Sequence, residues 1–245
     1  MTLKFSYMKW AVVLSSMIGG FTVSGYLHRV AALVMFGIFF MHIADLIRRK
    51  PLEFKSWKNM LTGPNTLLFT LRDVREFWAT LKWYFGKGER PSYGRWTYWE
   101  KFDYMAVFWG VTVIGTSGLM LWFPELFTRF LPGWVINVAT IIHSDEALLA
   151  AGFIFTIHFY NTHFRPEKFP MDTVIFTGRT SVEELKHERP DEYALLVANN
   201  ELEKHLVDPL APHIVRMMRI FGWCALIIGL VLVVCIIYAM FFGYK

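Results

Sequence analysis

The sequence predicts an all-α membrane protein, a bundle of four transmembrane helices accompanied by interfacial helices. Of its 245 residues, 55% are apolar and only 18% are charged, whereas soluble domains usually carry about 25% charged residues. Aromatic residues make up another 18%, with ten tryptophans, which suits a chain that crosses two membrane–water interfaces. Apolar stretches long enough to span a bilayer, about twenty residues each, occur four times along the chain.

The expected spans divide the chain into four parts. Residues 1–24 form an interfacial N-terminal segment, because the apolar stretch before the first span is short and Gly19-Gly20 should break a helix. A cleaved signal peptide is the alternative for this segment, although no convincing small-residue cleavage site follows it. We expect the spans at 25–47, 104–123, 135–160 and 214–242. They fall into a transmembrane part, 25–164, that contains a loop at 48–102, then a polar segment, 165–212, and a C-terminal transmembrane part, 213–245.

The positive charges are distributed as in a membrane protein. Twelve of the 25 Lys and Arg residues lie between Arg48 and Lys101 and eight between Arg165 and Arg219, whereas the connection 123–135 holds only Arg129. By the positive-inside rule, the loop 48–102 and the segment 165–212 are cytoplasmic, and the connection 123–135 lies outside. The first and third spans therefore run inward and the other two run outward. The net charge of +5 could suggest nucleic-acid binding. The uneven placement of Lys and Arg argues against it, because it is the pattern of a membrane protein.

Two features stand out in the polar segments. Residues 65–86, NTLLFTLRDVREFWATLKWYFG, are amphipathic, and we expect a surface helix whose aromatic residues face the membrane. Ser181 followed by Glu184 predicts a capping box at the start of a short helix. Neither cysteine belongs to a C-x-x-C-H motif, so covalent attachment of a c-type haem is excluded.

Four histidines lie in apolar spans, where an ionisable residue indicates function by default. His28 and His42 end one stretch, and His143 and His158 end another. In each helix the two histidines are roughly 21–22 Å apart along the axis and on much the same face. Because both helices run inward, His28 pairs in depth with His143 and His42 with His158. Such pairs predict the axial ligands of two b-type haems, whereas a zinc site would need more ligands at one depth.

Neighbouring residues have functional and structural interpretations. Arg29 either snorkels outward or pairs with a haem propionate. Asp145 and Glu146 face the aqueous rim, orient an imidazole N–H, or take protons from a quinol. His163 is either a solvated or interfacial histidine, or a hydrogen-bond partner or proton relay for a quinone. The glycines of the second span, Gly110, Gly115 and Gly118, allow close helix packing or leave room for the edge of a macrocycle.

Three stretches carry a resemblance to a known family. They are GYLHRVAALVMFGIFFMH, WEKFDYMAVFWGVTVIGTSGLMLWFPE and IIHSDEALLAAGFIFTIHFYNTHFRPEKFPMD. Over most of residues 20–180 the chain resembles the di-haem cytochrome b subunits of formate dehydrogenase, thiosulfate reductase and nickel–iron hydrogenase, which are prokaryotic cytochrome b561-like proteins. The resemblance implies a multi-pass subunit of a prokaryotic cell membrane that carries electrons between menaquinone or ubiquinone and a peripheral redox subunit, an iron–sulfur protein or a multihaem cytochrome c.

The chain departs from that family at one position. Members usually have an additional first helix, whose histidine ligates the inner haem opposite the residue that matches His158. That helix is missing from the sequence at hand, which opens with MTLKFSYMKW. Either His42 takes this role, or the helix lies upstream, or a partner subunit supplies it. We expect His42 because it lies at the right depth.

Two other functions fit the same composition. A haem-free membrane anchor or transporter would use the four histidines as hydrogen-bonding groups within the bundle. A b561-like reductase would bind haem but use no quinone. No site for the oxidation of formate, hydrogen or a sulfur compound is visible in the sequence, so we expect an electron-transfer subunit rather than the enzyme that acts on such a substrate.

Overall fold

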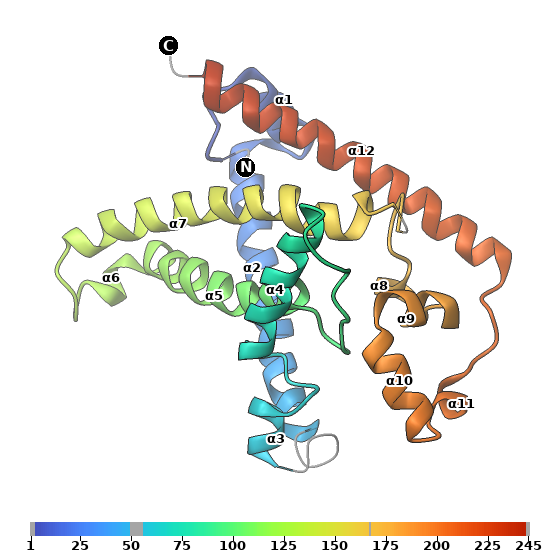
Figure 1. Ribbon diagram of the computed structural model, residues 1–245. Helices are drawn as coiled ribbons and strands as arrows, with labels where there is room; N and C mark the ends of the chain where they lie inside the picture. The colour runs from blue at the N-terminus through green and yellow to red at the C-terminus, as the bar shows by residue number, and fades with distance from the viewer. Residues whose placement is uncertain (1–2, 50–55, 167, 244–245) are drawn as a thin grey trace. The chain divides into compact units, whose positions relative to one another are not determined.

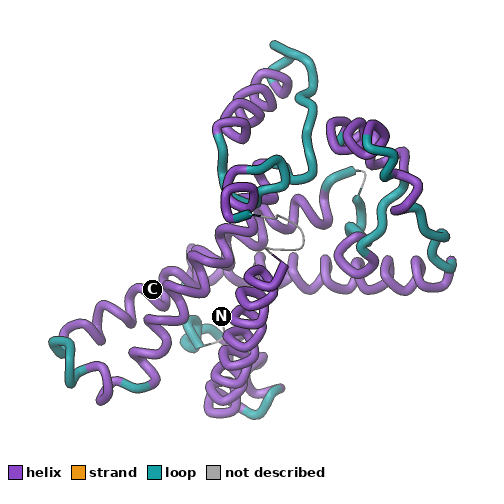
Figure 2. The backbone as a smooth tube through the Cα atoms, turned by 90° about the horizontal axis from the view of Figure 1, so that it is seen from below, coloured by secondary structure: helices purple, strands orange, loops and turns teal. Residues whose placement is uncertain are grey.

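A computed structural model describes residues 3–49, 56–166 and 168–243, and within these ranges the chain consists of helices and loops (Figures 1 and 2). Four of the helices are long and apolar enough to cross a membrane, as the sequence predicts. Their bounds are Gly20–Arg49 (α2), Tyr98–Trp122 (α5), Trp134–Phe164, and Pro212–Phe242 (α12). The chain is therefore a multi-pass membrane protein.

The third span changes its helical geometry part-way along. It begins as α7 (Trp134–Phe153) and continues as two π-helical turns, η2 (Ile154–His158) and η3 (Tyr160–Phe164). A π-helix has more residues per turn than an α-helix, so the rotation between His143 and His158 differs from the one that α-helical spacing gives. π-Helical turns are frequent at functional sites, and this one carries His158 and His163.

The remaining helices are short, and the chain separates into two compact units. The first unit contains residues 1–42, 109–172 and 216–245, and the second contains 43–108 and 173–215. The short helices are α1 (Lys9–Met17), α3 (Trp57–Thr62), α4 (Leu71–Tyr84), α6 (Pro124–Phe127), α8 (Val174–Thr177), α9 (Val182–Glu188), α10 (Pro190–Ala198) and α11 (Leu202–His205).

In the first unit, α1 packs into the core. The expected break is present, because α1 ends at Met17, Gly19 and Gly20 both have positive φ, and α2 begins at Gly20. Ala11 and Ser15 are fully buried, and Ala11 belongs to one apolar cluster with Ala239 of α12. Small residues one turn apart let two helices approach closely. One face of α1 is therefore part of the helix bundle, which differs from the wholly interfacial segment that the sequence predicts.

In the second unit, α4 turns its polar face inward. Asp73, Glu76 and Thr80 are all less than a tenth exposed, whereas Leu71 is 77% and Trp78 is 58% exposed. This reverses the usual arrangement of a helix on a soluble protein, which buries its apolar stripe. The aromatic residues of α4 therefore face outward, as expected for a helix that lies against a membrane.

The inward face of α4 is held by ion pairs. Lys101 Nζ lies 2.9 Å from a carboxylate oxygen of Asp73, and both side chains are almost fully buried. Burial alone would raise the pKa of Asp73, but hydrogen bonds from Lys101 and Thr70 outweigh burial and hold that pKa below its ordinary value. Burial raises the pKa of Glu76, although Arg72 donates to one of its oxygens at 2.6 Å. The polar segment after the third span joins this network, since Arg72 also bonds Asp191 at 2.8 Å.

The caps of the helices in the second unit agree with the sequence. Ser181 accepts a hydrogen bond from the backbone N–H of Glu184 and starts α9, as its position predicted. Thr70 and Asp73 form a capping box at the start of α4. The Asp73 carboxylate therefore serves both the helix cap and the ion pair with Lys101.

We expect Asp73→Ala to destabilise the second unit by about 3–5 kcal/mol, because the substitution leaves the Lys101 ammonium buried without its partner. Thermal unfolding of the protein in detergent would measure the loss. The stabilisation is fully present above the unfolded pKa of Asp73 and disappears as the pH falls through its lower folded pKa. The double substitution Asp73→Leu/Lys101→Met should recover most of the stability, and a double variant as unstable as Asp73→Ala would contradict this account.

Candidate cofactor site

Two of the predicted ligand histidines face each other in the first unit. The imidazole rings of His28, from α2, and His143, from α7, have centroids 5.9 Å apart and are inclined at 79° to one another. They lie 115 positions apart in the numbering, so the fold brings them together. This is the pairing that equal depth in the membrane predicts.

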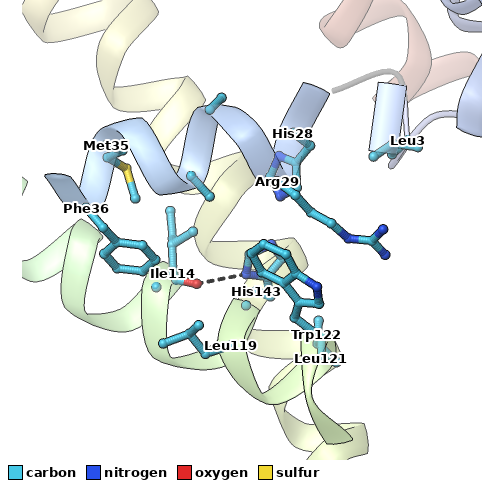
Figure 3. Close-up of a pocket in the computed structure, with 14 residues that line it drawn as sticks. Leu3, His28, Arg29, Met35, Phe36, Ile114, Leu119, Leu121, Trp122 and His143 are labelled. Carbon is cyan, nitrogen blue, oxygen red and sulfur yellow. Dashed lines mark hydrogen bonds between the residues drawn. The ribbon is translucent and has the colours of Figure 1, made fainter. Parts of the chain in front are cut away.

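The His143 ring is fixed by α5. Its Nδ1 lies 3.0 Å from the carbonyl oxygen of Ile114 (Figure 3). The same Nδ1 lies 3.2 Å from Oγ of Ser117. A carbonyl oxygen can only accept a hydrogen bond, so Nδ1 carries the proton and donates it. The other nitrogen, Nε2, then has a free lone pair, which is the form of imidazole that binds a metal ion. Sequence reasoning did not identify Ile114 or Ser117, because a contact between two spans leaves no local pattern.

A cavity of about 590 Å³ adjoins the two histidines. Its size falls within the range of pockets that bind cofactors and other small ligands. Every lining residue belongs to the first unit, and most are apolar. The wall consists of Leu3, His28, Arg29, Ala31, Ala32, Met35, Phe36, Ile114, Gly115, Gly118, Leu119, Leu121, Trp122 and His143.

Two glycines of α5 make the close approach of its neighbours feasible. A Cβ atom at Gly118 would lie 3.0 Å from Cε1 of His143, and one at Gly115 would lie 2.7 Å from the ring of Phe36. Gly110 is different, since no atom lies within 4 Å of its Cβ position. Gly115 and Gly118 therefore admit neighbouring rings, as close helix packing predicts, and both also line the cavity.

The cavity has a cationic end. Figure 3 shows the Arg29 side chain beside Trp122, away from the end where Met35 and Phe36 lie. The guanidinium carbon is 5.7 Å from the centroid of the Trp122 ring, a cation–π contact. A ligand that fills this cavity would therefore meet apolar side chains along most of its length and a positive charge at one end.

Asp145 and Glu146 lie one helical turn or less beyond His143. Lys4 Nζ bonds the Asp145 carboxylate at 3.1 Å and the backbone carbonyl of Ser144 at 3.2 Å. Glu146 is half-buried in the same helix. The N–H of His143 donates to the Ile114 carbonyl of α5 instead. The carboxylate of Asp145 therefore binds Lys4 of the N-terminal segment and does not orient that ring.

The other predicted histidines occupy different surroundings. His42 is half-buried in α2 and His158 is exposed on η2. His163 is only 6% exposed, so it is not a solvated histidine. Its Nδ1 donates a hydrogen bond to the carbonyl of Pro170 at 2.7 Å. Its imidazole therefore has the same tautomer as His143, with Nε2 as the acceptor.

The residues at this site fit a haem that is bound by two imidazoles. Two imidazoles that bind one metal ion from opposite sides, through bonds of about 2 Å, have ring centres roughly 6 Å apart, close to the 5.9 Å between His28 and His143. No group of three or more His, Cys, Asp or Glu residues suited to a bare metal ion occurs in the described part of the chain. The nitrogen donors beside the apolar cavity are the imidazoles of His28 and His143.

Comparison with known proteins found no matching family model, no matching curated protein and no matching solved structure.

Proposed function

We propose that this chain is a b-type cytochrome subunit that carries electrons across a membrane between quinone and a partner redox protein. The observation that carries the proposal is the facing pair His28 and His143, whose rings adjoin an apolar cavity. A haem bound there would supply one-electron oxidation and reduction. The protein's part is to hold the two imidazoles, to exclude water, and to place a positive charge at one end of the cavity.

Each residue at the cavity has a separate task in this proposal. The carbonyl of Ile114 holds His143 in the tautomer whose Nε2 is a ligand. Arg29 offers a guanidinium to a propionate, and Trp122 holds that guanidinium in place. Gly118 removes the side chain that would otherwise push the His143 ring away.

A second b-type haem, with His42 and His158 as ligands, belongs to the same proposal. What supports it is position in the chain, because each of these histidines lies about four helical turns inward of a member of the first pair. His163, whose imidazole is buried and whose Nε2 is the acceptor nitrogen, is the proposed hydrogen-bond acceptor for a hydroxyl of the quinol. Electrons would then pass between a quinone and the partner through the two haems.

We further propose that the bilayer is that of a prokaryotic cell membrane, with the loop 48–102 and the segment 165–212 on its cytoplasmic side. The distribution of Lys and Arg supports this orientation. The ion pair between Arg72 of α4 and Asp191 of α10, which links these two parts in the second unit, supports a single cytoplasmic surface for a peripheral redox subunit.

The visible spectrum of the purified full-length chain tests the function. Dithionite reduction should produce the sharp bands of low-spin b-type haem, and pyridine haemochrome analysis should give two haems per chain. If the protein is purified from haem-replete cells and shows no such bands, the alternative function, a haem-free membrane anchor, is supported instead. If inhibitors that bind at quinone sites do not affect the rate of haem reduction by a quinol, the quinone-independent reductase gains support.

The outward apolar face of α4 gives a separate prediction about membrane contact. Nitroxide labels at Leu71, Val74 and Trp78 in nanodiscs, in a variant without the two native cysteines, should relax faster with oxygen than with a nickel chelate. A label at Glu203, an exposed residue of α11, is the aqueous control. Greater accessibility to nickel than to oxygen at all three α4 positions would place this face in water and contradict the prediction.

A further inference from the structure

Ser117 is the second residue of α5 that touches the His143 ring. Its side chain is buried, with 4% of the residue exposed. Its Oγ lies 2.6 Å from the carbonyl of Val113 and 3.2 Å from Nδ1 of His143. A serine hydroxyl has one proton and two lone pairs. The carbonyls of Val113 and Ile114 can only accept, and the Ile114 oxygen is farther from Oγ, at 3.2 Å. The proton therefore goes to the nearer carbonyl, that of Val113, and Oγ is left to accept from His143.

The N–H of His143 is therefore shared between two acceptors. The Ile114 carbonyl lies at 3.0 Å and the Ser117 hydroxyl at 3.2 Å from the same nitrogen. The hydroxyl is polarised by its own donation to Val113, which makes its oxygen a better acceptor. Because Nδ1–H donation increases the electron density of the imidazole, each acceptor makes Nε2 a stronger ligand.

We propose that Ser117 is a positioning residue that lowers the redox potential of the haem bound by His143. This inference rests on the proposed function and adds the residue that tunes it. A more electron-rich imidazole stabilises the oxidised, more positively charged metal relative to the reduced one, so the hydrogen bond moves the potential downward. Ile114 contributes through its main chain, so Ser117 is the only one of the two acceptors that a side-chain substitution can remove.

The test is a redox titration of the haems in the full-length protein, followed by visible and EPR spectroscopy. Ser117→Ala should shift the affected haem in favour of its reduced form by roughly threefold to tenfold, which is an upward change of about 30 to 60 mV at 59 mV per tenfold. Ser117→Thr keeps a hydroxyl that can bond the same carbonyl, and should restore the original potential. The other haem should not change in either variant.

Thr116 provides a matched control on the same helix. Its hydroxyl also bonds backbone carbonyls about one turn earlier, that of Thr112 at 2.6 Å and that of Val113 at 3.3 Å, but the residue is exposed. Thr116→Val removes a comparable hydrogen bond from α5 without touching His143. Its haem potentials should equal those of the unsubstituted protein, and an equal shift in this variant would show that the change reflects helix stability rather than the imidazole.

The outcomes separate the inference from the proposed function. If the unsubstituted protein contains no b-type haem, both fail. If it contains haem and Ser117→Ala leaves both potentials unchanged, the inference alone is overturned. If Ser117→Ala is obtained without haem, Ser117→Cys decides the matter, because sulfur is a weak acceptor. That variant should show a smaller upward shift, and an unchanged potential would overturn the inference.

Discussion

His28→Ala and His143→Ala should each remove the same haem from the protein. The two rings belong to one site, with centroids 5.9 Å apart beside one cavity, so either substitution leaves a haem with only one of its two ligands. We expect each variant to retain about half of the haem, and the double variant to lose no more than either single one. Redox titration followed by visible spectroscopy would show the same component missing in all three.

His158→Ala and His42→Ala distinguish the two sites. Each should retain the haem of His28 and His143 and lose the other one. If His42→Ala keeps both haems, the second ligand of the inner haem comes from elsewhere, such as an upstream helix or a partner subunit. His205→Ala, a substitution in exposed α11, is the control for effects of losing any histidine. Loss of different components in His28→Ala and His143→Ala would contradict a shared site.

The length of the apolar stretches was sufficient to predict the four spans, because a bilayer requires an unbroken apolar stretch and few other structures contain one. The break at Gly19-Gly20 was predictable for a similarly local reason, since glycine adopts positive φ without strain. The burial of α1 was not, because its short apolar stretch looks the same whether it lies at an interface or packs through Ala11 against α12.

The site was predictable in part. The common direction of their two spans paired His28 with His143 in depth, and their proximity in the structure agrees with that pairing. The atoms that hold His143 come from Ile114 and Ser117, on a different span, and no spacing rule connects residues on separate helices. The π-helical turns before His158 and His163 were not foreseen either, because the sequence was interpreted with the same rotation per residue throughout.

The helix α4 buries its polar face and exposes its apolar face. Its stripe of Leu71, Val74 and Trp78 could have packed onto a soluble core, in which case Asp73 and Glu76 would be solvated. The ion pairs from Lys101 and Arg72 instead compensate the buried carboxylates, and the apolar stripe is left outward. Amphipathicity alone predicted a surface helix but could not show that its polar face would be the buried one.

Gly118→Leu should prevent the haem of His143 from binding. A Cβ atom at this position would already lie 3.0 Å from Cε1 and 3.3 Å from Nδ1 of the His143 ring, and three more carbons would have to occupy the space of the imidazole or of the cavity. Overpacking of this kind typically costs about 1–3 kcal/mol, and a displaced ring also loses its bond to Ile114. We expect about half of the haem to be lost and the remaining component to keep its potential.

Gly118→Ala and Gly110→Leu make this test specific. The alanine variant requires a shift of only a few tenths of an ångström in the His143 ring, so it should keep the haem, with weaker retention and an altered EPR spectrum. Gly110 lies in the same helix with open space at its Cβ position, so Gly110→Leu changes helix propensity and side-chain volume equally without touching the ring. Equal haem loss in Gly110→Leu and Gly118→Leu would show that α5 tolerates no leucine at either position, and the contact between Gly118 and His143 would then not be the cause.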